Sequence, residues 1–330
     1  MSPKGKTARL LVGVLLLTLA SFTFSTCGGT GIDLAGGGVS GTGVSTGAIT
    51  SFGSVEMNGV HYLTDNNTIK MSHGDDHSSE LDQAVFRVGM VVTIHHGPND
   101  NNALEIDYRD NLQGLIAAKS SGADNTFTVL GQTVVVSDTA LFASLNLNEL
   151  VEVSGFVDSA GRIRATYIAR NPQSPHHGGE IEVKGFVSGL SSSAASFQLG
   201  PLPDGTGTTV AVSFSPAVGA GLADGMYVQV VTTGAQPVSG PISATSIVEL
   251  TPRTVFPDKA MVDLEGLVTV SPSGSGNALS FAVEGKRVQM DGNTQFPGGG
   301  SVANIQPDVR LQVQGTENGG VLSAAKIIFR

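Results

Sequence analysis

Hydrophobic and polar residues alternate in short runs over most of the chain after residue 47, with almost no helical periodicity. The clearest runs read VVTI from Val91, LVEV from Leu150, YVQV from Tyr227 and RLQV from Arg310. Strict alternation of this kind is typical of β-strands that bury one face. The many glycines between the runs supply the positive φ angles that tight turns require. The pattern therefore predicts an all-β protein with many short strands.

The same order of strands recurs four times. Each copy begins with a strand that reads GAI, GLI, GFV or GLV, and these strands start at Gly47, Gly114, Gly185 and Gly266. Hairpin turns are expected at Asn58-Gly59, Gly131-Gln132 and Gly285-Lys286. Phenylalanines recur at equivalent places in two copies (Phe127 and Phe142, Phe281 and Phe296), which predicts that they belong to the core. About five strands in roughly 60–80 residues favour a small closed barrel of the OB type, because closure leaves no unpaired edge.

These repeats divide the chain into four expected barrels, at residues 47–109, 110–170, 180–250 and 260–330. A segment rich in Pro and Gly separates the second barrel from the third, and a segment with two prolines, Pro252 and Pro257, separates the third from the fourth. Repeat three departs from the pattern, because GPLPDGTGTT from Gly200 inserts an extra loop into its hairpin. Barrels this small bury only about 60% of their surface when isolated. We therefore expect neighbouring repeats to pack against one another as a rod.

The first residues have the pattern of an export signal. Lys4, Lys6 and Arg9 precede an apolar run over residues 10–24, which is too short for a comfortable membrane span. Cys27 is the only cysteine of the chain and follows directly. This arrangement resembles the lipobox of bacterial lipoproteins, although Thr26 is unusual before the cleavage site. It predicts a signal peptide at 1–26, lipidation of Cys27 and a Gly-rich tether over 27–46.

Charge narrows the class of partner. The net charge is −10, and removal of the predicted signal leaves 15 basic and 28 acidic residues, a net of −13. Such a surface repels nucleic-acid phosphates and anionic lipid headgroups. Nucleic acid is therefore not an expected partner, and attachment to a membrane is expected through the lipid on Cys27.

The run TGAITSFGSVEMNGVHYLTDNNT from Thr46, behind a Gly-rich tether and a lipobox-like cysteine, resembles a known family. The similarity is to bacterial envelope lipoproteins that repeat an OB-like domain of unknown function. GFVDSAGRIRATYI in repeat two also fits that pattern, whereas repeat three is less similar. The resemblance implies an exported lipoprotein with β-barrel modules. It implies no activity and no site residues.

One segment contains several side chains that bind metals. His73, Asp75, Asp76 and His77 lie within five residues, and two imidazoles with two carboxylates suit Zn²⁺ or a similar cation. Three further histidines of the same repeat could complete such a shell: His61, His95 and His96. The competing interpretation is a solvated acidic loop, because metal ligands need rigid support. His176 and His177 lie in a linker and are interpreted as polar spacer.

Catalytic motifs are weak. GGGVSG from Gly36 fits G-x-G-x-x-G and GVSTG from Gly43 fits G-x-S-x-G, but neither follows a predicted strand and precedes a helix. We therefore expect no enzyme activity and no cofactor. The favoured hypothesis is a non-enzymatic, lipid-anchored binding or scaffold protein of the cell envelope, with a glycan or an envelope protein as partner. Gly28 after the cysteine is compatible with sorting to the outer membrane. The alternative is a divalent-metal-binding envelope protein that uses the His/Asp loop.

Overall fold

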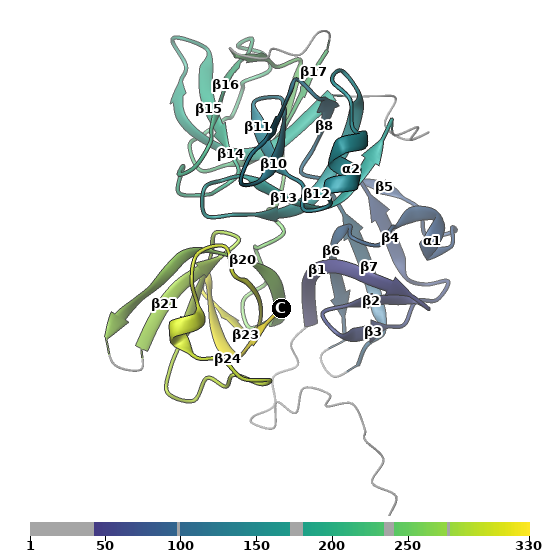
Figure 1. Cartoon of the computed structure of the whole chain (residues 1–330), viewed down its shortest axis with the longest axis vertical. Coiled ribbons are helices and arrows are strands. Elements are labelled where there is room, and N and C mark those ends of the chain that lie inside the picture. Colours follow the sequence, from purple (N-terminus) through teal and green to yellow (C-terminus); the bar gives the residue numbers. More distant parts are fainter. Residues whose placement is uncertain (1–42, 98–99, 172–180, 234–240, 276–277) are drawn as a thin grey trace, which may run out of the picture. The chain divides into compact units, whose positions relative to one another are not determined.

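The computed structural model describes residues 43–97, 100–171, 181–233, 241–275 and 278–330. Cys27, the predicted signal peptide at 1–26 and His176-His177 lie outside these ranges, as does most of the predicted tether. The described chain is all-β, as the sequence predicts, and Figure 1 shows the strands β8–β17 together, with β1–β7 and β20–β24 as separate groups. No helix among the described residues is long and apolar enough to cross a membrane.

Repeat 4 shows the barrel most completely. Its elements are β20 (Met261–Ser275), β21 (Ala278–Val283), β22 (Lys286–Met290), the 3₁₀ helix η1 (Val302–Asn304), β23 (Arg310–Asn318) and β24 (Val321–Phe329). The strands pair in the closed order β20-β21-β22-β24-β23-β20, and only β22 and β24 run parallel. Five strands closed in this order form an OB-like barrel.

Repeats 2 and 3 close by the same order, each with one strand broken in two. Repeat 2 contains β8 (Leu112–Leu115), β9 (Ala118–Ser121), β10 (Asn125–Val129), β11 (Gln132–Val135), α2 (Thr139–Ser144), β12 (Leu150–Val157) and β13 (Ile163–Arg170). Repeat 3 contains β14 (Ile181–Ser191), β15 (Ser196–Gly200), β16 (Val210–Ser213), β17 (Tyr227–Thr232), β18 (Ile242–Ser243) and β19 (Ser246–Glu249). The first strand of repeat 2 is interrupted between β8 and β9, and the last strand of repeat 3 between β18 and β19. The insertion after Gly200 lengthens a hairpin and leaves the barrel order unchanged.

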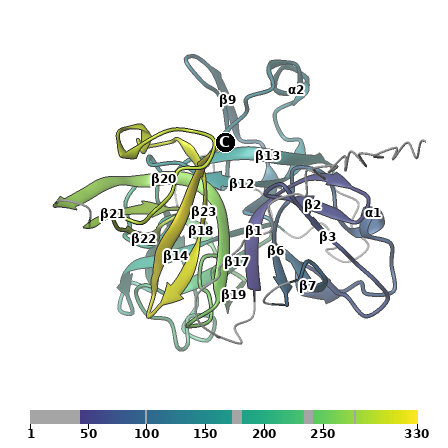
Figure 2. The same ribbon diagram turned by 90° about the horizontal axis from the view of Figure 1, so that it is seen from below.

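Repeat 1 is the most irregular barrel. It contains β1 (Gly43–Phe52), β2 (Val55–Met57), β3 (Val60–Tyr62), β4 (Ile69–Ser72), β5 (Asp75–Asp76), α1 (Asp82–Val85), β6 (Val91–His96) and β7 (Ala103–Tyr108). A parallel bridge from Leu63 to Asn102 and the parallel pair β4–β7 complete the ring. In Figure 2, β1 lies beside β6, with which it pairs antiparallel.

The start of β1 and the positions of two hairpin turns differ from the sequence prediction. β1 begins at Gly43, inside the predicted tether 27–46, because its first residues pair with strands on both sides. The hairpin turns expected at Gly131-Gln132 and Gly285-Lys286 lie one residue earlier, at Leu130-Gly131 and Glu284-Gly285. Both residues of each turn have positive φ, as they do at Asn58-Gly59. Type I′ turns need this conformation, and glycine occupies the second position in all three.

The hydrophobic core confirms the expected role of the recurring phenylalanines. Phe127 and Phe281 are almost fully buried, Phe142 is buried, and Phe296 packs partly buried against the core of repeat 4. Repeats 2 and 3 share one continuous core, whereas repeats 1 and 4 each have their own. A smaller cluster joins repeats 1, 2 and 4 through Ala48, Val91, Phe156 and Leu267.

The first strands of the repeats join the barrels in pairs. β1 of repeat 1 runs parallel to β20 of repeat 4, with Val44 opposite Val262. β8 of repeat 2 runs antiparallel to β14 of repeat 3, with Gln113 opposite Glu182. Repeats 2 and 3 thus pack as neighbours, as expected, whereas repeat 1 pairs through its first strand with repeat 4, so that the strand pairing does not follow the order of the chain. Buried polar side chains lie on both pairs of strands, among them Gln113, Glu182 and Asp263.

Candidate binding site at the junction of the repeats

The candidate site begins on the outer face of the β6–β7 hairpin in repeat 1. The apolar side chains of this hairpin, such as Ile94 and Ile106, point into the barrel core. The alternate positions therefore face outward, and they are polar. Thr93 lies opposite Asp107, and His95 lies opposite Glu105. Two rows of polar side chains thus cover this face of the hairpin.

A cavity of about 460 Å³ lies against this face. Its other walls come from the segment 251–257 between repeats 3 and 4, from Arg109 and Asp110 after β7, and from Lys184 and Tyr227 of repeat 3. Apolar side chains of Val44, Val91, Val255 and Phe256 line part of it. This volume lies within the range of small-molecule sites in proteins. We call it the junction cavity.

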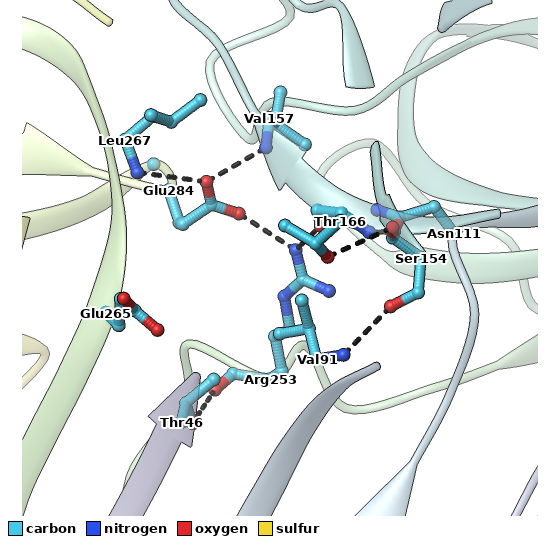
Figure 3. Close-up of polar contacts among 12 residues, drawn as sticks. Thr46, Val91, Asn111, Ser154, Val157, Thr166, Arg253, Glu265, Leu267 and Glu284 are labelled. Atoms are coloured by element: carbon cyan, nitrogen blue, oxygen red, sulfur yellow. Dashed lines mark hydrogen bonds and ion pairs between the residues drawn. The ribbon is translucent and has the colours of Figure 1, made fainter. Parts of the chain in front are cut away.

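The wall formed by segment 251–257 is held in place by Arg253. Its Nη2 donates to the backbone oxygen of Gly155 at 2.6 Å and to Glu284 Oε2 at 2.9 Å (Figure 3). Its own backbone oxygen accepts from Thr46 Oγ1 at 3.3 Å. Glu284 Oε1 accepts from the backbone nitrogen of Val157 at 2.9 Å. One arginine therefore ties the segment to repeats 1, 2 and 4.

A second set of contacts joins repeats 1 and 2. The backbone nitrogen of Val91 donates to Ser154 Oγ at 3.0 Å (Figure 3). Thr166 Oγ1 donates to the backbone oxygen of Gly89 at 2.6 Å. These bonds connect β6 to β12 and the turn before β6 to β13. The wall that carries Thr93 and His95 is thereby fixed against repeat 2.

Behind the junction cavity lies a buried cluster of charges centred on Lys184. Its Nζ is 2.5 Å from Asp110 Oδ1 and also bonds Glu182 Oε1, and less than a tenth of each of the three side chains is exposed. Burial alone would raise the pKa of Asp110, but the charge of Lys184 and the bond to His73 hold it well below its usual range. Burial, followed by the charge of Asp110, raises the pKa of Glu182 to about 7. The charge of Lys184 is therefore matched mainly by Asp110.

The four residues of the predicted metal loop are dispersed. His73 points toward the buried cluster, where its Nε2 is 3.3 Å from Asp110 Oδ1 and 3.9 Å from Glu152 Oε1. Burial opposes the charged form of His73, but the bond to Asp110 raises its pKa. Asp75 and Asp76 are exposed on β5, and His77 Nδ1 is 2.9 Å from Glu80 Oε1.

In the described part of the chain, no group of three or more His, Cys, Asp or Glu side chains is placed to hold a metal ion. The other histidines of repeat 1 also separate. His61 lies 3.6 Å from Glu56, His96 Nε2 lies 3.2 Å from Ser45 Oγ, and His95 lines the junction cavity. Metal binding by the loop stays a prediction.

Sequence reasoning missed Asp110, Lys184 and Arg253. One signal could have found the buried cluster. The residue before each recurring glycine is polar in all four repeats (Thr46, Gln113, Lys184 and Glu265), and all four are buried. A polar residue that recurs on a strand of otherwise apolar pattern is expected to be buried, and a buried polar side chain needs a polar partner. Such a recurrence therefore indicates that another element packs against the strand with polar side chains of its own. No comparable local pattern marks Arg253, whose partners lie far away in sequence.

The comparisons with known proteins concern the repeats themselves. The chain matches the model of a domain of unknown function (DUF5666) at residues 46–107, 113–169 and 265–328. These ranges correspond to repeats 1, 2 and 4, and together they cover more than half of the chain. Repeat 3 lies outside the match although its strands pair in the same order. A comparison with curated proteins found no match. The chain therefore belongs to the family of proteins built from this domain of unknown function, here in tandem copies.

Proposed function

We propose that this protein is a non-enzymatic binding protein of the cell envelope, held at a membrane by a lipid on Cys27, with the junction cavity as its binding site. The observation that carries the proposal is the construction of the cavity. Its walls come from repeat 1, repeat 3 and the segment before repeat 4, and Arg253 fixes that segment in place. A rigid concave site with a few placed polar groups is a typical small-molecule site.

The sequence supports the anchor and the compartment. A basic start, an apolar run and a single cysteine form an export signal with a lipidation site. Gly28 is compatible with sorting to the outer membrane in this proposal. The net charge of −10 opposes binding to nucleic acid and favours partners that are neutral or cationic.

The anchor is tested by comparing the native chain with Cys27→Ala in the cell. We expect the native chain to fractionate with membranes and to incorporate a labelled fatty acid. The variant should lose the label and appear in the soluble fraction. A Cys27→Ala protein that stays with membranes, together with a native chain that takes up no label, would contradict the anchor.

The binding site is tested by a thermal-shift screen of the full chain against envelope glycans, small organic amines and divalent cations. A ligand at about 100 times its dissociation constant stabilises the folded state by about 2.7 kcal/mol. Thr93→Trp fills the junction cavity and should abolish the shift. Thr133→Trp on β11, away from the cavity, is the matched control and should leave the shift intact. A shift that survives Thr93→Trp would place the binding site elsewhere.

A further inference from the structure

The junction cavity carries an excess of hydrogen-bond acceptors on its repeat 1 side. Glu105 faces the cavity from β7, and its side chain has no hydrogen-bond or ion-pair partner among the described residues. Asp107, two residues further along the same strand, places Oδ2 at 3.1 Å from Arg109 Nε. Its other oxygen, Oδ1, is buried without a hydrogen-bond partner in the described structure.

Asp110 adds a third acceptor, and its side chain is fully buried. Oδ1 of Asp110 is occupied by Lys184 and His73, but Oδ2 has no hydrogen-bond partner within the described residues. A buried carboxylate oxygen without a donor costs free energy, and native proteins rarely leave one so. Asp107 and Asp110 thus add negative charge beside Glu105 on this side of the cavity.

The cations of the cavity wall are already occupied. Arg109 pairs with Asp107, Lys184 with Asp110 and Glu182, and Arg253 with Glu284. None of these three is left to bind an anionic ligand. Glu105, in contrast, is a carboxylate without a counter-ion, and the whole chain has a net charge of −10. The electrostatic preference of the cavity is therefore for a cation.

Segment 251–257 adds apolar surface to the cavity. Val255 lines the cavity and is more than half exposed, whereas the other apolar lining residues, Val44, Val91 and Phe256, are buried. An aliphatic stem would cover this surface and remove it from water. A primary ammonium group carries three donors, which suits a wall with several free acceptors.

We propose that the junction cavity binds a small aliphatic amine, with the ammonium group at Glu105 and Asp107 and the carbon chain against Val255 and Phe256. This inference rests on the proposed function, because it names the ligand class of the same site. Glu105 provides the main charge contact, and Asp107 adds a second carboxylate beside it on the same face of β7. No covalent step is involved.

The test is isothermal titration of the full chain with cadaverine (1,5-diaminopentane). 1,5-Pentanediol keeps the carbon chain without charge, and glutarate reverses the charge. We expect cadaverine to bind, and the diol and glutarate not to bind. Glu105→Gln should weaken cadaverine binding by about tenfold or more, because a charge-assisted hydrogen bond is lost. The matched control Glu249→Gln, at an exposed position of β19, should bind as the native chain does.

The outcomes separate this inference from the proposed function. Equal binding of cadaverine to the native chain and to Glu105→Gln, or no binding at all, would overturn the amine site. If a different ligand then binds and Thr93→Trp blocks it, the cavity is a binding site for another class of molecule. If no ligand of the screen binds in a manner that depends on Thr93, the proposed function itself fails.

Discussion

The two strand junctions between the barrels place a buried aspartate in opposite surroundings. At the junction of repeats 1 and 4, Asp263 accepts hydrogen bonds from the side-chain amides of Asn58, Gln312 and Gln314, at 2.7–3.0 Å. At the junction of repeats 2 and 3, Asp110 is bound by the ammonium group of Lys184. The direct donors to Asp263 are neutral amides, with Arg330 one step further away on Gln312, whereas the direct donor to Asp110 is charged. We call the first junction neutral and the second charged on this basis.

The electrostatic consequence differs in sign. Burial raises the pKa of Asp263 to about 6, although the bonds from Gln314 and Gln312 oppose this shift. At Asp110, Lys184 and His73 outweigh burial and lower the pKa. Amide donors thus satisfy hydrogen bonds without fully stabilising the charge, whereas lysine does both. The charged junction is consequently more sensitive to the loss of one member, because the remaining charges stay buried without compensation.

Removal of Lys184 gives the largest expected effect. Lys184→Met leaves Asp110 and Glu182 buried without their cation, which should destabilise the protein by about 3–5 kcal/mol. The midpoint of urea unfolding, followed by circular dichroism, measures this loss. Lys259→Met removes an exposed lysine and should change stability by no more than about 0.5 kcal/mol. The triple variant Lys184→Met/Asp110→Asn/Glu182→Gln should recover much of the loss. Equal stability of Lys184→Met and Lys259→Met would contradict the statement that the charged junction is sensitive to the loss of one member.

At the neutral junction, protonation of Asp263 should make the stability of the folded protein depend on pH. The pKa of Asp263 in the folded protein, about 6, lies above its usual 3.8, so the folded state binds this proton more tightly than the unfolded state. The resulting stabilisation is complete below about pH 4 and is lost as pH rises through 6. It amounts to at most about 3 kcal/mol. Glu182, with a pKa raised to about 7, acts in the same direction at the other junction.

Asp263→Asn removes only the contribution of the neutral junction. Urea midpoints measured between pH 4 and pH 7 should therefore vary less with pH in this variant than in the native chain. Asp204→Asn changes an exposed aspartate in the inserted loop of repeat 3 and serves as the control, with the native pH profile. An unchanged slope in Asp263→Asn would mean that Asp263 is not buried among amides as described.

The smallest expected difference in stability is between alanine substitutions of equivalent glycines at the two junctions. A Cβ added at Gly185 would lie 2.7 Å from the backbone oxygen of Gly200, so that a strand would have to move. At Gly47 the nearest atoms are side-chain oxygens of Asn58 and Glu265, at 2.3 and 2.8 Å, so that side chains rather than a strand would have to move. Their movement would weaken the bonds that Asn58 makes to Asp263 and that Glu265 makes to the backbone nitrogen of Ala48. We expect Gly185→Ala to cost about 2–3 kcal/mol and Gly47→Ala about 1 kcal/mol. Urea midpoints of the two variants, measured side by side, check the order, and the reverse order would contradict this reading of the packing.

The sequence predicted the barrels better than their assembly. Alternation and recurring glycines are local signals, and they gave the strands, the repeats and the buried roles of Phe127 and Phe281. The turn positions were wrong by one residue because glycine occupies the second place of a type I′ turn. The pairing of β1 with β20 joins residues more than 200 positions apart, and no local pattern specifies such a partner.

The site was less predictable for the same reason. The histidines and aspartates between residues 73 and 77 predicted a metal site from their spacing in the sequence. In the structure, their side chains lie in different directions and have different partners. Glu105, Asp107 and Asp110 are ordinary residues of a polar strand end when read locally. They form a candidate site only because segment 251–257 and repeat 3 face them, which the sequence does not record.

The central claim is that repeat 1 pairs with repeat 4, because this contact brings segment 251–257 against β6 and forms the junction cavity. Val44 and Val262 are opposite one another in β1 and β20 and belong to the same core. A Val44→Cys/Val262→Cys pair in a Cys27→Ala background should form a disulfide, detected by mass spectrometry and by mobility on a non-reducing gel. Val44→Cys/Val183→Cys, which places the second cysteine in the core of repeat 3, should remain reduced. A disulfide in the second pair and not in the first would contradict the assembly described for this protein.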